Sequence, residues 1–183
     1  SIFIDKHRLL TSSDTFSGGV NLFRNTDKLD KFWGPSTDNN GSVDSSANYA
    51  SDVNHELIAT KYVFHTWGLK ASDAGVKTTQ QIYFEKGVYT ISFLARNNSN
   101  RNETNSLSFF TEDCANRGWQ PLGTTTIDNV WKKHVITFTT TKTTVEMYPR
   151  VHNPENKGIP GGSLYFANFK LEAGSIATDW CQS

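Results

Sequence analysis

The chain has 183 residues and a mass of 20.5 kDa, a size that suits one domain around a single core. Its 18 basic and 18 acidic side chains give a formal net charge of zero, so no cationic field is available to attract nucleic acid or anionic lipid. No apolar run approaches the roughly 18 residues of a membrane-spanning helix. Composition and charge therefore argue against nucleic-acid partners and against membrane insertion.

Alternation of apolar and polar side chains predicts strands over most of the chain, and no segment carries a convincing helical stripe. Residues 1–17 are expected to be a lead-in segment or linker, and residues 18–183 one domain. In chain order, strands are expected over residues 19–25, 57–67, 78–84, 89–96, 107–111, 131–141, 145–152 and 164–171. Residues 34–54 and 112–129 read as loops longer than a hairpin needs, which is typical of binding loops.

The clearest strand follows Gly87, where Tyr89, Ile91 and Phe93 alternate with polar or smaller side chains. Strands of this kind, separated by Gly, Asn and Pro, are typical of antiparallel sandwiches. The predicted fold class is therefore all-β, an antiparallel β-sandwich of the jelly-roll form.

Four motifs stand in a fixed order along the chain. They are Gly19-Val20-Asn21-Leu22 followed by Trp33; Gly87-Val88-Tyr89-Thr90-Ile91-Ser92-Phe93; Trp131-Lys132-Lys133 with Thr137-Phe138-Thr139; and Lys170-Leu171-Glu172-Ala173-Gly174 with Thr178-Asp179-Trp180. Together they resemble the carbohydrate-binding-module-like jelly rolls of bacteriophage tail proteins, over nearly all of residues 18–180.

This resemblance implies a non-catalytic module of a distal-tail, baseplate or receptor-binding protein of phages that infect Gram-positive bacteria. The implied ligand is a cell-wall polysaccharide or related host glycan, and the implied partners are other tail subunits, reached through the parent protein. The implied location is the virion tail, acting at the host cell surface. Many related sugar-binding jelly rolls hold a structural calcium ion, for which residues 25–30 and Asp179 offer oxygen ligands.

Aromatic and polar side chains outside the predicted core are the candidate ligand-binding residues. Sugars present flat C–H faces that stack on rings, and hydroxyl pairs that bond with Arg, His and Tyr. Because alternation would place the polar candidates on one sheet face if their strands are neighbours, we expect them to form one groove. The predicted set is Trp67, Trp119, Arg96, Tyr148, Arg150 and His152. A solvated face, or rings that pin loops onto the sheet, is the alternative for each.

Catalysis is not expected. The chain has no Gly-x-Ser-x-Gly elbow, no His-Glu-x-x-His and no phosphate-cradling Gly loop, and nothing selects a pair of carboxylates. A structural spacer or protein-interaction module of the tail, with the same fold and no sugar ligand, is the rival hypothesis. One disulfide, between Cys114 and Cys181, is an open alternative, and the chain has no paired CxxC motif of the kind that binds zinc.

Overall fold

The structure is a computed structural model that describes residues 19–31, 33–35, 40–45, 53–67, 76–78, 85–97, 105–110, 121–140, 150–152 and 163–182. These residues include ten strands. They are β1 (Trp33–Pro35), β2 (Asn40–Ser45), β3 (Tyr62–Trp67), β4 (Val76–Thr78), β5 (Gly87–Asn97), β6 (Asn105–Phe110), β7 (Pro121–Ile127), β8 (Lys132–Thr140), β9 (Arg150–His152) and β10 (Ser163–Ala173). In this part of the chain, no helix is long and apolar enough to cross a membrane.

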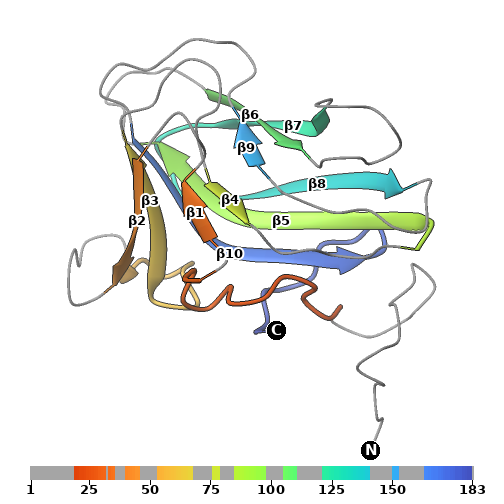
Figure 1. Ribbon diagram of the computed structural model, residues 1–183, viewed down its shortest axis with the longest axis horizontal. Coiled ribbons are helices and arrows are strands. Elements are labelled where there is room, and N and C mark those ends of the chain that lie inside the picture. The colour runs from red at the N-terminus through yellow and green to blue at the C-terminus, as the bar shows by residue number, and fades with distance from the viewer. Residues whose placement is uncertain are drawn as a thin grey trace, which may run out of the picture.

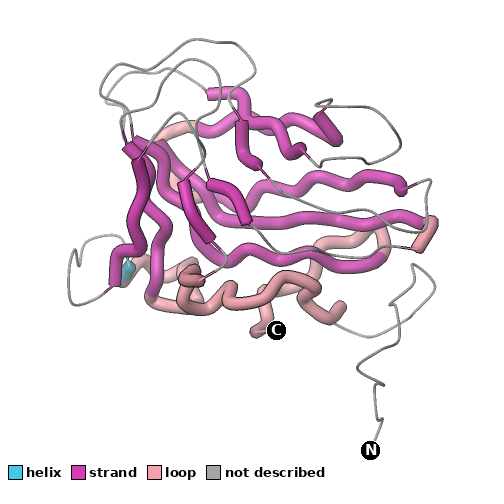
Figure 2. Tube along the Cα trace, viewed as in Figure 1, coloured by secondary structure: helices cyan, strands magenta, loops and turns pink. Residues whose placement is uncertain are grey.

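The strands form two five-stranded antiparallel sheets. Sheet A has the order β1-β4-β9-β6-β7, and sheet B has the order β2-β3-β10-β5-β8. Figure 1 shows the long strands β5, β8 and β10 running together in sheet B, and Figure 2 shows that strands dominate the described chain. The predicted all-β antiparallel sandwich is confirmed.

The core lies between the sheets and follows the predicted alternation. On β5, Tyr89, Ile91 and Phe93 are buried in it, and on β8, Ile136 and Phe138 join them. Strand β8 alternates buried and exposed positions along most of its length, because its other face meets solvent. The expected strands over 89–96, 131–141 and 164–171 are thus present as β5, β8 and β10.

Two strands occur inside segments predicted to be loops. Strand β2 lies in the expected loop 34–54 and β7 in the expected loop 112–129, so those two predictions are wrong. Both strands are rich in Ser, Thr, Asn or Gly and lack an apolar period. The backbone of β7 lies close to the Ile136 side chain of β8 at Gly123, since a Cβ on Gly123 would lie 2.5 Å from Cγ2 of Ile136.

Residues 19–25 are not a strand, contrary to the prediction. Leu22 donates one backbone bond to Leu171 O (2.7 Å), but the buried Asn21 side chain replaces the rest of a ladder. Its Oδ1 accepts the N–H groups of Phe23 and Leu171, both at 3.1 Å. Its Nδ2 donates to the carbonyl oxygen of Phe169 (2.9 Å). Asn21 therefore ties this segment to β10 by side-chain bonds.

Strand β10 contains a bulge between Ala167 and Lys170. Asn168 adopts a left-handed φ of 52° there, and its side chain leaves the strand. Its Nδ2 donates to Leu57 O (2.8 Å) and its Oδ1 accepts the N–H of Ala59 (3.1 Å). The bulge thus holds residues 53–60, the covering segment, against the outer face of sheet B.

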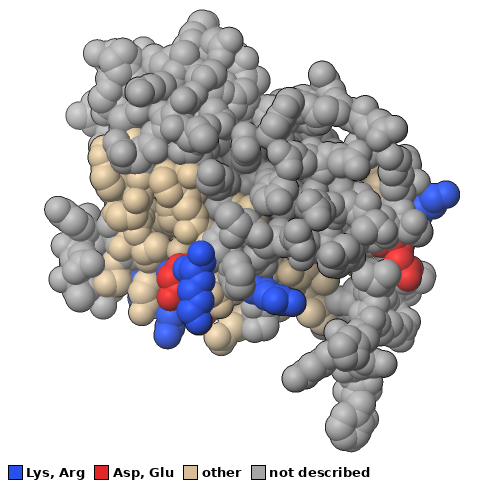
Figure 3. Space-filling view, in the orientation of Figure 1, with Lys and Arg blue, Asp and Glu red and all other residues tan. Residues whose placement is uncertain are grey.

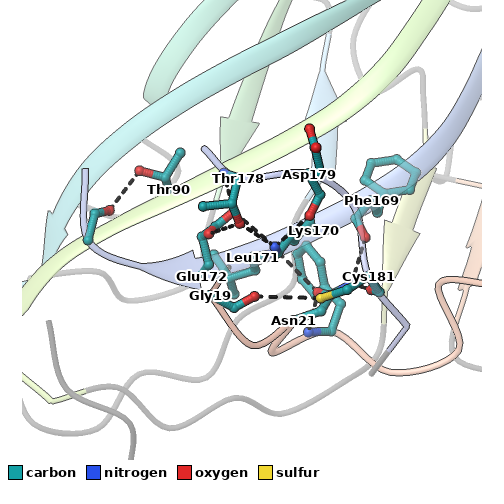
Figure 4. A network of polar contacts seen from close by, with 12 residues as sticks. Gly19, Asn21, Thr90, Phe169, Lys170, Leu171, Glu172, Thr178, Asp179 and Cys181 are labelled. Carbon is teal, nitrogen blue, oxygen red and sulfur yellow. Dashed lines mark hydrogen bonds and ion pairs between the residues drawn. The ribbon is translucent and has the colours of Figure 1, made fainter. Parts of the chain in front are cut away.

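The residues after β10, 174–182, form a tail that is clamped to the outer face of sheet B (Figure 4). Lys170 and Glu172 are fully buried, with Nζ 3.6 Å from Oε2. Lys170 Nζ donates to Thr178 Oγ1 (2.5 Å) and to the carbonyl oxygen of Asp179 (2.7 Å). Thr178 in turn donates its hydroxyl and its N–H to the two carboxylate oxygens of Glu172. The closing motif of the sequence is therefore a structural clamp.

Several sequence predictions fall outside the described residues. These are the lead-in segment 1–17, the parts of the expected strands over 79–84 and 141–149, and Cys114. Cys181 is a free cysteine in the structure, and its Sγ lies 3.5 Å from the carbonyl oxygen of Gly19.

The described charges are mixed in sign. In the view of Figure 3, Lys and Arg atoms lie beside Asp and Glu atoms at the lower edge of the described surface, with uncharged surface next to them. Among the described residues, the exposed side chains of Lys132 and Asp128 form an ion pair. The carboxylate of Asp128 also accepts the N–H of Val130, and these two bonds lower its pKa. This distribution agrees with the net charge of zero.

We expect Lys170→Met to lower the free energy of unfolding by about 3–5 kcal/mol, because it leaves the buried carboxylate of Glu172 without its cation. Urea denaturation measures the loss. Lys132→Met is the matched control: its ion pair is exposed, so it should lose less than about 1 kcal/mol. Similar losses in both variants would contradict the clamp.

His134 is a buried histidine between the sheets. Its Nδ1 lies 2.8 Å from Thr125 Oγ1 of β7, and its ring stacks on Phe93 at 5.6 Å. Burial lowers its pKa below the usual value, against the smaller opposing effects of the Ala95 backbone and the Asp128 charge.

We therefore expect stability to fall with pH below about 6.5, the ordinary pKa of histidine. There the unfolded chain takes up a proton that folded His134 resists, so unfolding is favoured as pH decreases. Urea unfolding between pH 7 and pH 5 measures the slope. His134→Leu should show a shallower slope than the wild type, and an unchanged slope would show that other groups cause the pH dependence.

Candidate functional site

The outer face of sheet B carries the candidate site. Alternation places Phe64 of β3 and Phe166 of β10 in the core. Their neighbours along each strand, His65 and Tyr165, therefore lie on the opposite face. On β5, Arg96 follows the buried Ala95 and takes the same outer face.

Strand register brings three of these side chains together. Tyr165 is the direct partner of His65 on one side and of Arg96 on the other. The rings of His65 and Tyr165 stack with centroids 4.4 Å apart and planes 8° from parallel. The Arg96 guanidinium carbon lies 4.1 Å from the centroid of the Tyr165 ring, within the range of a cation–π contact.

Two tryptophans lie at the ends of this arrangement. Trp67, two residues beyond His65 on β3, is tilted against its ring at 5.2 Å and is 39% exposed. Trp131 lies 5.7 Å from the Arg96 guanidinium at the other end and is only 6% exposed. We call Trp67, His65, Tyr165 and Arg96 the aromatic row.

Hydrogen bonds to main-chain carbonyl oxygens hold the Arg96 end of the row in place. Arg96 Nη1 donates to the carbonyl oxygen of Asn97 (3.0 Å). Asn97 is itself buried, and its backbone N–H donates to Asp128 O while its Nδ2 donates to Ile127 O. A guanidinium fixed by a ring and a main-chain carbonyl loses little freedom when it binds a ligand.

The row has a defined chemistry. Both faces of the Tyr165 ring are occupied, one by the His65 ring and one by the guanidinium. Trp67, at the end, is the most exposed aromatic side chain of the row. The arrangement combines one accessible indole with hydroxyl, imidazole and guanidinium groups, which suits a ligand that has apolar faces and hydroxyl edges.

The predicted site residues are divided between the two sheets. Trp67 and Arg96 are brought together in the row. Arg150 and His152 belong to β9 of sheet A, where Arg150 pairs with Lys77 and Phe110 and His152 pairs with Ser108. The expectation of one groove on one sheet is therefore wrong, because β9 pairs with β4 and β6 and not with β5.

Trp119 and Tyr148 lie outside the described residues, and only the backbones of Arg150 and His152 are described. Ligand binding by these four residues stays a prediction. Of the other tryptophans, Trp33 and Trp131 are buried, and Trp180 is half-buried. Trp33 stacks on Phe169 at 4.6 Å.

Sequence reasoning missed Tyr165 and gave His65 no role of its own. Tyr165 lies in a strand whose neighbours read as core, and its importance depends on which residues it faces across the sheet. That register is set by tertiary pairing. The only local signal was the outward phase of Tyr165 between Leu164 and Phe166.

No group of three or more His, Cys, Asp or Glu side chains in the described chain could hold a metal ion. In the predicted calcium region, the Asp30 carboxylate accepts a bond from Asn25 Nδ2, and that of Asp27 accepts one from Gln182 Nε2. These carboxylates are engaged in bonds within the fold. Calcium binding, which also uses backbone carbonyl oxygens, stays a prediction.

Similar solved structures are carbohydrate-binding modules. The chain aligns with the CBM22-1–GH10 modules of Clostridium thermocellum xylanase 10B, complexed with xylohexaose (TM-score 0.57, 13% identity), over 90% of its length but 30% of that chain. It also aligns with TmCBM61 in complex with β-1,4-galactotriose (0.56, 16%; 84% and 99% covered). The C-terminal family 22 module of Clostridium thermocellum Xyn10B gives 0.60 at 10% identity, with 86% and 96% covered.

No family model and no curated protein matches the sequence. At these identities the structural likeness concerns the fold, which is an antiparallel, jelly-roll β-sandwich of the carbohydrate-binding-module type.

A double-mutant cycle tests the geometry of the row. We expect Arg96→Met and Tyr165→Leu to be coupled by about 0.5–2 kcal/mol in the free energy of unfolding, since they share a cation–π contact. Arg96→Met with Val135→Ala, on the exposed face of β8, is the control and should be additive within about 0.5 kcal/mol. Additivity in both cycles would show that the guanidinium does not rest on the Tyr165 ring.

Proposed function

We propose that the chain is a non-catalytic carbohydrate-binding module that holds a saccharide on the aromatic row. The observation that carries the proposal is the continuous contact of Trp67, His65, Tyr165 and Arg96 on one outer sheet face. The fold shared with carbohydrate-binding modules supports it.

The chemistry of the row suits weak sugar binding. Stacking one sugar face on Trp67 removes about 60 Å² of apolar surface from water, worth roughly 1.5 kcal/mol. Hydrogen bonds from the guanidinium and the phenol add specificity, because they must meet hydroxyl groups in fixed positions. After the cost of ordering the ligand, the expected affinity is about millimolar to micromolar.

The biological setting is proposed from the sequence motifs. Their resemblance to phage tail modules favours a domain of a tail or baseplate protein that recognises a cell-wall saccharide of a Gram-positive host during adsorption. Its partners would then be the host glycan and neighbouring tail subunits, with no nucleic acid and no membrane insertion. Several copies on a symmetric tail would raise avidity by about 10²- to 10⁴-fold over a weak single site.

A structural spacer or protein-interaction module of the tail is the second candidate. Exposed apolar side chains favour it, since Ile176 is 76% exposed and Val135 is 46% exposed. A spacer would bury such groups, and Trp67, against a neighbouring subunit.

The test is the binding of fluorescently tagged, multimerised domain to a broad panel of Gram-positive cells, with purified wall polysaccharide as competitor. We expect labelling that the polysaccharide abolishes and that the double variant Trp67→Ala, Tyr165→Leu loses. Val135→Ala, another exposed apolar position of sheet B, is the matched control and should label like the wild type.

Three outcomes would count against the proposal. Labelling that polysaccharide does not compete would indicate a protein receptor. Labelling retained by the double variant would remove the site from the row. No labelling of any cells would favour the spacer.

A further inference from the structure

The Arg96 end of the aromatic row is a corner where three segments of the chain meet. The end of β5 contributes Arg96, the turn between β7 and β8 contributes Trp131, and the covering segment contributes His55. Trp131 is the common neighbour of the other two. The Arg96 guanidinium carbon lies 5.7 Å from an indole ring centroid, and the His55 ring centroid lies 6.3 Å from the indole. The line of contacts therefore continues past Arg96 to His55.

The half-buried His55 has a defined hydrogen-bonding state. Its Nδ1 accepts the backbone N–H of Leu57 (3.2 Å), so the neutral ring carries its proton on Nε2. Nε2 makes no hydrogen bond with another described residue, and it is not buried as Nε2 of His134 is. His55 thus offers one N–H donor that a ligand can reach.

Packing and main-chain bonds fix this corner. The backbone N–H of Asn97, the last residue of β5, donates to Asp128 O (2.8 Å) and ties the strand to the turn. Val53 and Ile58 of the covering segment are buried in one apolar cluster with Trp131. The donor groups of the corner are therefore held in place before a ligand arrives, which lowers the entropic cost of binding.

The two ends of the site differ in chemistry. Trp67 is exposed enough to offer a ring face, whereas Trp131 is almost fully buried. The corner instead offers N–H donors, from the Arg96 guanidinium and from His55 Nε2. Such donors suit the acceptor oxygens of sugar hydroxyl or acetamido groups.

The row is too long for one sugar ring. Strand β3, which carries Trp67, and strand β5, which carries Arg96, are separated by β10. The row thus spans two strand spacings, about 10 Å, before it reaches His55. A ligand that contacts both ends must contain at least two linked sugar units.

We propose that His55 is a further ligand-binding residue, which makes the corner a second subsite of the saccharide site. One sugar unit stacks on Trp67, and a unit farther along the same ligand accepts hydrogen bonds from Arg96 and from the Nε2–H of His55. This inference rests on the proposed function, because it extends the aromatic row. Its signature is a contribution of His55 that appears only with ligands of two or more units.

The probe for the test is the wall polysaccharide used as competitor in the cell-binding experiment, partially hydrolysed and separated into monosaccharides and oligosaccharides. Binding is followed in ¹H–¹⁵N spectra by two sets of signals. Trp67→Ala assigns one of five indole signals by its loss, and His55→Gln assigns the signals of one of five imidazoles. We expect oligosaccharides to move the signals of both Trp67 and His55.

His55→Phe should weaken oligosaccharide binding by about three- to tenfold and leave monosaccharide binding unchanged, since it keeps a ring beside Trp131 but removes the donor. His55→Gln, whose amide N–H reaches about as far as Nε2, should recover most of the affinity. Both variants lose the Nδ1 acceptor of Leu57 N–H, so the difference between them isolates the donor. Glu56→Gln, at an exposed neighbouring position, is the matched control and should bind like the wild type.

Thermal melting verifies the fold of each variant, and the wild-type imidazole signals remain as the test if His55→Phe does not fold. The inference is overturned if oligosaccharides move the Trp67 signal but not those of His55, or if His55→Phe binds them like the wild type. In both cases the proposed function stands. Equal losses in His55→Phe and His55→Gln would also overturn it, because the ring would then only position the covering segment. If no fragment moves the Trp67 signal, the row is not the site and the proposed function fails as well.

Discussion

The bulge in β10 is the constraint on which both faces of sheet B depend. In a regular strand, the two-residue period that puts Phe166 in the core would also put Lys170 and Glu172 there. The extra residue, Asn168, shifts the phase, so that Phe169 and Leu171 pack inward and the two charged residues meet the tail. Without that shift, an ion pair would replace aromatic packing between the sheets.

Asn168 also organises the outer face of sheet B. Its side chain binds the covering segment, which divides the face into two parts. On one side of the bulge Tyr165 forms the centre of the aromatic row, and on the other side Lys170 fixes the tail. A single strand thus positions both the aromatic row and the tail.

The sequence predicted the fold class because the regularly spaced apolar residues of β5 and β8 are buried in the folded chain. It could not predict β2 or β7, whose backbones pair with neighbouring strands that are distant in sequence or lack an apolar period. Nor could it predict the segment around Asn21, where side-chain bonds replace a ladder. Local pattern does not record such long-range partners.

The candidate site shows the same limit. Trp67 and Arg96 were identified from their types and outward phase, whereas their connection through His65 and Tyr165 requires the register of three strands. Arg150 and His152 were assigned to the same groove because sequence does not say which sheet a strand joins. The motifs that carry the family resemblance proved structural: Asn21, Glu172 and Thr178 hold segments together.

Strand β10 has one set of residues that faces the core and another that faces outward. This division determines how the outer face of sheet B can change. Positions 65, 67, 96 and 165 lie on rigid strands whose opposite faces already fill the core. Exchanging these four side chains alters what the surface recognises while the volume packed between the sheets stays the same. The scaffold is therefore suited to retargeting by a small combinatorial library, in which diversity resides on strands and the backbone needs no redesign.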